Sequence, residues 1–234
     1  MKRLFPCLLL ILAVSSCGLM TPSQTRGSLY PGMYEEKPVT LLVMPPINNT
    51  ANVDAKELLY TSISRPLAEA GYYVIPPALA MDVLRQESAY DAELFLDRPL
   101  RQFHDFFGAD AVVFPIIDAW AKQGVGINTK LHYIIKSTLT DQVLFDRTCD
   151  LFLDLSVHSE ETTADGQKKS PSLLSVLADL AVSALNTALT DHIEAARKAN
   201  YYIFQDLPAG RYDELYLKDQ DYAAEPRDVS KTVK

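Results

Sequence analysis

Two kinds of apolar pattern follow one another along this chain, and their order restricts the fold more than any other feature. Val39–Met44 is an uncharged, largely apolar run closed by two prolines, which is typical of a strand covered on both faces. From about residue 128 the period changes to two, and Lys130–Thr138 and Val143–Val157 flank a short turn. A covered strand followed by a half-covered hairpin predicts a mixed sheet.

Helical patterns lie between and after these strands. The predicted helices begin near four residues: Asp54, Pro77, Pro99 and Pro171. Pro66 should kink the first of them, because its ring removes a backbone donor. A third strand is predicted at Ala111–Ile117, where Pro115 indicates an edge strand or a bulge. This order predicts a single α/β domain, with a mixed sheet flanked by helices and a long C-terminal helix ending near Lys198.

The N-terminus carries a targeting pattern. Lys2 and Arg3 precede the uncharged segment Leu4–Val14, which is shorter than the roughly 20 apolar residues of a transmembrane helix. The residues Val14-Ser15-Ser16-Cys17 resemble the lipobox of bacterial lipoproteins. The resemblance implies cleavage between Ser16 and Cys17, with diacylglycerol on the thiol and an acyl chain on the new amino group. We expect no other cofactor.

Removing such a signal changes the composition that matters for function. Lys2 and Arg3 leave with it, so the formal charge deepens from −8 to −10, which argues against nucleic acid as a partner. Of the three cysteines only Cys149 then keeps a free thiol, so no internal disulfide is expected. We predict a signal at 1–16, a lipidated cysteine with a flexible tether at 17–37, the α/β domain at 38–217 and a mobile tail at 218–234.

Three stretches of the chain, taken in order, carry a resemblance. They are Leu41–Thr50 (LLVMPPINNT), Gly108–Val113 (GADAVV) and Asp141–Asp146 (DQVLFD). The chain resembles an uncharacterised family of bacterial lipoproteins that includes a neisserial antigen. More widely it resembles the anticodon-binding-domain-like fold of the TolB amino-terminal domain, the curli-secretion lipoprotein and lipoprotein activators of peptidoglycan synthases. The resemblance implies a scaffold, an activator or a secretion component rather than an enzyme.

Residues that could carry chemistry do not form a recognisable site. The four histidines are scattered, and the chain has neither an HExxH nor a CxxC pattern for a metal. Glycine-rich phosphate motifs and a GxSxG nucleophile are also missing from the sequence. Cys149 shares a strand face with Phe145 and Leu151, where a thiol is usually inert core. We therefore predict no catalytic residues and no metal site.

Two segments are candidate interfaces. Residues 171–190 contain one charge, Asp179, among many leucines, so this helix should be covered on more than one side. It is either a central core helix, a helix shared with a partner, or a membrane span. The tyrosine-rich segment after it either binds a partner or folds back onto the domain. The candidate interface residues are Leu173, Leu177, Leu180, Tyr201, Tyr202 and Phe204.

These observations favour a lipid-anchored interaction or scaffold protein of the cell envelope. Gly18 follows Cys17, which favours the outer membrane with the domain facing the periplasm, although surface exposure stays open. We expect a homodimer or larger assembly that serves a transport or secretion complex. The alternatives are a lipid-anchored envelope hydrolase and a pore-forming secretion lipoprotein.

Overall fold

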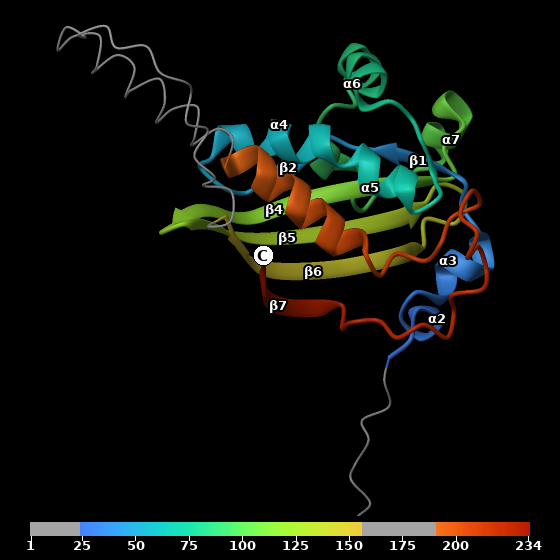
Figure 1. Cartoon of the computed structure of the whole chain (residues 1–234). Coiled ribbons are helices and arrows are strands. Elements are labelled where there is room, and N and C mark those ends of the chain that lie inside the picture. Colours follow the sequence, from blue (N-terminus) through green and yellow to red (C-terminus); the bar gives the residue numbers. More distant parts are fainter. Residues whose placement is uncertain (1–23, 156–190) are drawn as a thin grey trace, which may run out of the picture.

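The strands of the computed structural model form one seven-stranded sheet in the order β3-β1-β4-β5-β6-β7, with the short β2 also beside β4 (Figure 1). The structure describes residues 24–155 and 191–234. The strands are β1 (Thr40–Val43), β2 (Ile47–Asn48), β3 (Tyr73–Val74), β4 (Ala111–Gln123), β5 (Gly126–Ser137), β6 (Val143–Asp154) and β7 (Asp228–Val233). The helices are α2 (Arg26–Leu29), α3 (Pro31–Glu36), α4 (Val53–Ser62), α5 (Ser64–Glu69), α6 (Pro77–Gln86) and α7 (Arg101–Phe107), with a 3-10 turn, η1 (Ala92–Phe95).

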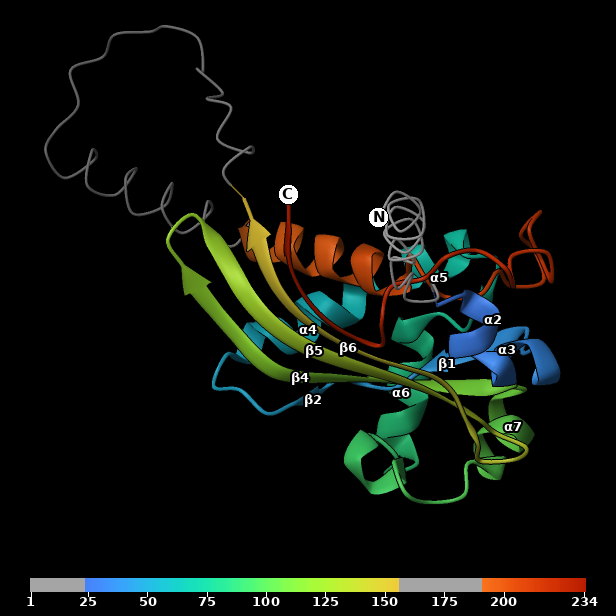
Figure 2. The ribbon, with the colours of Figure 1, turned by 90° about the horizontal axis from the view of Figure 1, so that it is seen from below.

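The sheet is mixed, as the two apolar patterns predicted. β3, β1 and β4 are parallel, whereas β4, β5 and β6 form two antiparallel hairpins. Helices α4 and α5 and the C-terminal helix (residues 191–204) lie on one side of the sheet, and α6 and α7 lie on the other (Figure 2). The predicted α/β class, with a mixed sheet flanked by helices, is therefore confirmed.

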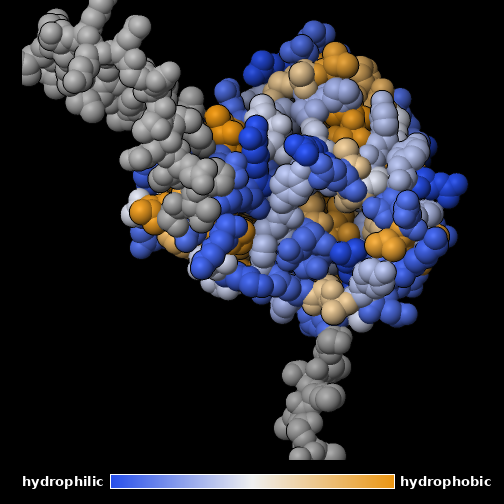
Figure 3. All heavy atoms as spheres, in the orientation of Figure 1, coloured by the Kyte–Doolittle hydropathy of each residue, from blue (hydrophilic) through white to orange (hydrophobic). Residues whose placement is uncertain are grey.

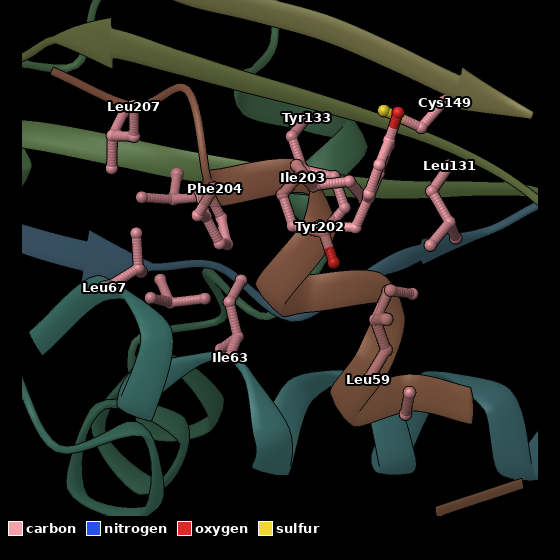
Figure 4. Close-up of a cluster of buried hydrophobic side chains, with 14 of the residues drawn as sticks. Leu59, Ile63, Leu67, Leu131, Tyr133, Cys149, Tyr202, Ile203, Phe204 and Leu207 are labelled. Carbon is pink, nitrogen blue, oxygen red and sulfur yellow. The ribbon is translucent and has the colours of Figure 1, made fainter. Parts of the chain in front are cut away.

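Each side of the sheet has its own core. On the first side, Leu59 of α4 and Ile63, which follows it, pack with residues of the C-terminal helix over apolar residues of the sheet such as Tyr133 and Cys149 (Figure 4). On the second side, α6 and α7 cover β1 and β4 through residues such as Leu84 and Phe103. The alternation predicted for Val143–Val157 is thus confirmed within β6, where Phe145, Cys149 and Leu151 are fully buried.

Two local predictions about helix α4 and strand β4 need correction. The N-cap of α4 is Asn52, whose side chain accepts the Ala55 N–H at 3.0 Å, so the helix begins before Asp54. Of the two predicted alternatives for Pro115, the edge strand is wrong because β4 is internal, whereas a register shift does occur nearby, between Ile117 and Ala119. β1 pairs with β4 as far as Val113, and β2 pairs with β4 from Ile116 onward. Proline has no N–H to continue the ladder between them, so the ladder is interrupted there.

The expected tether is wrong for the described part of 17–37. Residues 26–29 and 31–36 form α2 and α3, and their apolar side chains are buried against the domain. These buried residues are Leu29, Tyr30, Met33 and Tyr34. Burial of large apolar side chains stabilises short helices that would not form alone. The folded domain therefore extends upstream of residue 38.

The expected mobile tail is also wrong. Residues 228–233 form β7, which pairs in parallel with β6 from Thr148 to Leu153. Just before it, Thr148 N–H donates to the Arg227 carbonyl at 2.9 Å, and Ala224 N–H donates to the Gln24 carbonyl at 2.9 Å. Backbone pairing satisfies donors and acceptors that would otherwise need water, and it orders this polar segment.

Candidate interaction surface

The structure separates the three aromatic residues that we predicted at an interface. Tyr201 is 40 % exposed, whereas Tyr202 and Phe204 are 8 % and 4 % exposed. Phe204 packs edge-on against Tyr133 with ring centroids 5.2 Å apart, and the Tyr202 hydroxyl donates to Glu225 at 2.5 Å. Tyr202 and Phe204 are therefore mostly buried in the domain interior, and only Tyr201 of the three is exposed. The other candidates, Leu173, Leu177 and Leu180, lie outside the described residues, as does Cys17.

Tyr201 stands between two hollows of the surface. The first, of about 320 Å³, lies where α5, the C-terminal helix and the segment after it meet. It is lined by Arg26, Pro66, Glu69, Ala70, Tyr201, Phe204, Gln205, Leu207, Ala209, Asp213 and Leu215. The second, of about 390 Å³, lies between the C-terminal helix and the end of β7, and Tyr201 lines it as well. We call Tyr201 with these two hollows the Tyr201 surface.

This surface combines an apolar floor with charges of both signs. Leu215 is 38 % exposed beside the buried Phe204 and Leu207. Hydrogen bonds from Arg65 and Tyr201 lower the pKa of Glu69, so this carboxylate is charged at neutral pH. In Figure 3, the face that carries the C-terminal helix shows small hydrophobic areas among hydrophilic side chains. An apolar centre with a polar rim is the usual composition of a protein interface.

A buried ion pair supports the rim of the first hollow. Arg26 lies 2.8 Å from Asp219, whose side chain is fully buried. The same carboxylate accepts the Tyr34 hydroxyl at 3.0 Å and the Ala209 N–H at 2.9 Å. Asp219 thereby joins the N-terminal helices to the C-terminal segment. Its partners are 10 to 193 positions away, so local sequence patterns could not reveal them.

A second buried cation lies beneath the C-terminal helix. Arg147 of β6 is fully buried and contacts Asp206 at 2.6 Å and Glu225 at 3.2 Å, and its guanidinium also lies over the Tyr202 ring. The alternation of β6 places position 147 on the core face with Phe145 and Cys149, so the sequence could have shown that Arg147 is buried. The prediction for this strand rested only on the apolar residues of that face. Its carboxylate partners make it a structural ion pair.

Other reactive side chains are engaged in the fold. Burial raises the pKa of Cys149 to about 11, so its thiol is protonated at neutral pH. Trp120 donates to His192 at 2.9 Å, and His132 contacts Asp146 at 2.7 Å. Within residues 24–155 and 191–234, no cluster of three or more metal-ligating side chains occurs. In the same residues, no helix is long and apolar enough to cross a membrane.

The geometry defines a class: a mixed α/β domain, tied together by buried ion pairs, that presents an amphipathic aromatic surface. Residues 29–209 match the family described as "Putative lipoprotein GNA1162-like", and the chain belongs to that family. The predicted relation to a neisserial lipoprotein family is thus confirmed. The matched region includes Tyr201 and ends before Asp219, Glu225 and β7.

The chain is also similar to individual proteins. The chain is 34 % identical over 115 residues to the putative lipoprotein NMB1124/NMB1162 of Neisseria meningitidis serogroup B. That match covers 49 % of this chain and 52 % of the relative, so the chain spans about half the relative's length. The crystal structure of lipoprotein GNA1162 from Neisseria meningitidis matches with 23 % identity and a TM-score of 0.43, over 64 % of this chain and 99 % of that one. The LpoB C-terminal domain from Salmonella enterica matches with 13 % identity and a TM-score of 0.34, over 53 % and 93 %.

Proposed function

We propose that this protein is a lipid-anchored interaction protein of the bacterial outer membrane that faces the periplasm and self-associates through the Tyr201 surface. In this proposal it acts as a scaffold in an envelope transport or secretion complex and not as an enzyme. The observation that carries the proposal is the shape of the Tyr201 surface, in which one part-exposed aromatic side chain lines two neighbouring hollows.

Such a surface suits association with a second copy of the chain. A two-fold interface requires a patch that is complementary to itself, because the same residues meet from both sides. The part-exposed ring of Tyr201 and the hollows beside it lie on one patch, so two copies of the patch can place apolar area against each other. Arg26, Glu69 and Asp213 around the first hollow supply both signs of charge, which favours pairing of the patch with its own copy.

The chemistry of the reactive residues supports a binding role. Cys149, His192 and the buried carboxylates are occupied in packing and ion pairs, as described above. Tyrosine is enriched at interfaces because its ring supplies apolar area and its hydroxyl a polar contact. The lipobox at Cys17 and the lipoprotein family support the anchor. A protein with several acyl chains needs no transmembrane helix for stable anchoring.

Self-association can be tested by sedimentation equilibrium of the full-length protein in a mild detergent. We expect a dimer or larger assembly, and we expect Tyr201→Arg to raise its dissociation constant about tenfold or more. Tyr212→Arg is the matched control, because Tyr212 is 71 % exposed and does not line either hollow. A wild-type monomer at all concentrations, or equal effects of the two variants, would contradict the proposal.

The anchor is tested separately by labelling cells with radioactive palmitate. The wild-type protein should incorporate the label and sediment with the outer membrane, and Cys17→Ala should lose the label and leave the membrane fraction. Cys149→Ala keeps the lipobox and serves as control. Unchanged labelling or fractionation of the Cys17 variant would refute the anchor without affecting the interface.

A further inference from the structure

The parallel part of the sheet contains a reversal of strand order. From β1 the chain crosses to β3 through α4 and α5, and from β3 it crosses back over β1 to β4 through α6 and α7. The two crossovers lie on opposite faces of the sheet (Figure 2). Between the carboxyl ends of β1 and β3 the connecting chains therefore diverge and leave a crevice. Ligands of open α/β sheets bind in crevices of this kind.

A hollow of about 310 Å³ occupies this position. Pro46 after β1 and Pro77 after β3 lie at its base, with α4 on one wall and α6 on the other. It is lined by Pro46, Lys56, Glu57, Tyr60, Thr61, Pro77, Ala78, Met81, Asp82, Arg85 and Tyr90. Its size lies at the lower end of the range for small-molecule sites, about 300 to 1,000 Å³. It shares no lining residue with the Tyr201 surface.

The base of this crevice is held in place by Tyr60. This buried residue of α4 donates its hydroxyl to the Pro77 carbonyl at 3.0 Å, and the Val43 carbonyl lies 3.3 Å away. One side chain thus joins the end of β1, the start of α6 and helix α4. A site whose walls are fixed in this way loses little conformational entropy when it binds.

Two cations converge inside the crevice on a single aromatic ring. Lys56 Nζ lies 4.6 Å from the centroid of the Tyr90 ring, and Arg85 Cζ lies 5.3 Å from the same centroid. The two charges are therefore at most about 10 Å apart, which is the screening length in roughly 0.1 M salt. In the described part of the chain, neither cation forms an ion pair with a carboxylate. An anion between them would relieve their mutual repulsion.

The remaining lining residues define the rest of the ligand. Pro46, Pro77 and Met81 offer apolar contacts, and Tyr90 offers a ring face. Glu57 and Asp82 line the same hollow, and their negative charges would repel a polyanion. The crevice therefore fits a compact molecule with one acidic group and an apolar or aromatic body.

We infer that the crevice between α4 and α6 binds a small organic anion, whose carboxylate or phosphate group lies between Lys56 and Arg85 and whose apolar body packs against Tyr90 and Met81. This site is independent of self-association. It would add ligand recognition to a protein proposed above as an interaction partner.

The test is a ligand-observed NMR titration of the full-length protein in a non-ionic detergent with phenyl phosphate, benzoate and phenol. We expect saturable binding of at least one of the two anions and about tenfold weaker binding of phenol, which lacks the charge. The anion that binds more tightly identifies the acidic group. The double variant Lys56→Gln/Arg85→Gln should weaken binding of that anion about tenfold or more.

Two variants of Tyr90 test whether its aromatic ring contributes to binding. Tyr90→Phe keeps the aromatic face and should keep binding, whereas Tyr90→Leu should weaken it severalfold. Arg101→Gln removes an exposed cation of α7 outside the crevice and should bind as the wild type does. If neither anion shows saturable binding, or if the double variant binds as tightly as Arg101→Gln, the inference is wrong.

Discussion

Positive side chains lie against tyrosine rings in several regions of this fold, and two of these regions differ in how their charge is balanced. Beneath the C-terminal helix, Arg147 lies over Tyr202 and is paired with Asp206 and Glu225. At the crevice between α4 and α6, Lys56 and Arg85 approach Tyr90, and the described residues supply no carboxylate partner to either. The difference indicates that the first cluster stabilises the fold, whereas the second is available to a ligand.

The largest effect on stability is expected when the buried cation Arg147 is removed. Arg147→Met leaves Asp206 without its guanidinium partner, and we expect a loss of about 3 to 5 kcal/mol in the free energy of unfolding. Chemical denaturation followed by circular dichroism measures it. Arg101→Gln breaks an exposed pair and should cost about 0.5 kcal/mol or less. Similar losses of unfolding free energy in the two variants would show that the Arg147 cluster does not stabilise the fold more than an exposed ion pair does.

A smaller and pH-dependent effect is expected at the edge of the same cluster. Burial alone would raise the pKa of Glu225, but hydrogen bonds from Lys231 and Tyr202 and the charge of Arg147 lower it below its usual value of 4.5. A carboxylate whose pKa is lower in the folded state stabilises the fold above its unfolded pKa, and this stabilisation is lost as the pH falls.

Glu225→Gln should therefore cost about 1 to 2 kcal/mol at pH 7, with the gap to the wild type narrowing as the pH falls below 4.5. Denaturation curves recorded at several pH values for both proteins give the difference directly. A gap that stays constant or widens on acidification would mean that Glu225 is not charged through these contacts.

The smallest effect is expected at the crevice between α4 and α6. Lys56→Gln and Arg85→Gln should each change the free energy of unfolding by no more than about 1 kcal/mol, because a partly exposed cation over a ring contributes little. The same denaturation assay measures it. A loss of unfolding free energy as large as that of Arg147→Met would show that Lys56 and Arg85 stabilise the fold, as Arg147 does.

Much of the architecture could be predicted because its signals are local. The antiparallel hairpins follow from alternation and short turns, and the break at Ile63 between α4 and α5 follows from Pro66. Helices α2 and α3 were missed although Leu29 and Met33, like Tyr30 and Tyr34, have helical i, i+4 spacing. The intervening Pro31 and Gly32 concealed this short pattern.

The ion-pair clusters could not be predicted, because their partners are brought together only by the fold. Arg147 and Asp206 are 59 positions apart, and Arg26 and Asp219 are 193 apart. β7 has weak alternation and many polar residues, so its order depends on parallel pairing with a strand 80 positions upstream, as in Thr148 with Asp228. Of the predicted interface residues that the structure describes, only Tyr201 is exposed, because the sequence does not show which tyrosines the fold covers.

Site-specific photo-crosslinking in living cells tests the central claim most directly. A photoreactive aromatic amino acid would replace Tyr201 in the full-length protein, and Tyr212 in a matched control. The account predicts that position 201 forms a crosslinked homodimer, joined to residues of the Tyr201 surface in the second copy, whereas position 212 does not. The absence of a homodimer from position 201, or equal crosslinking from both positions, would contradict it.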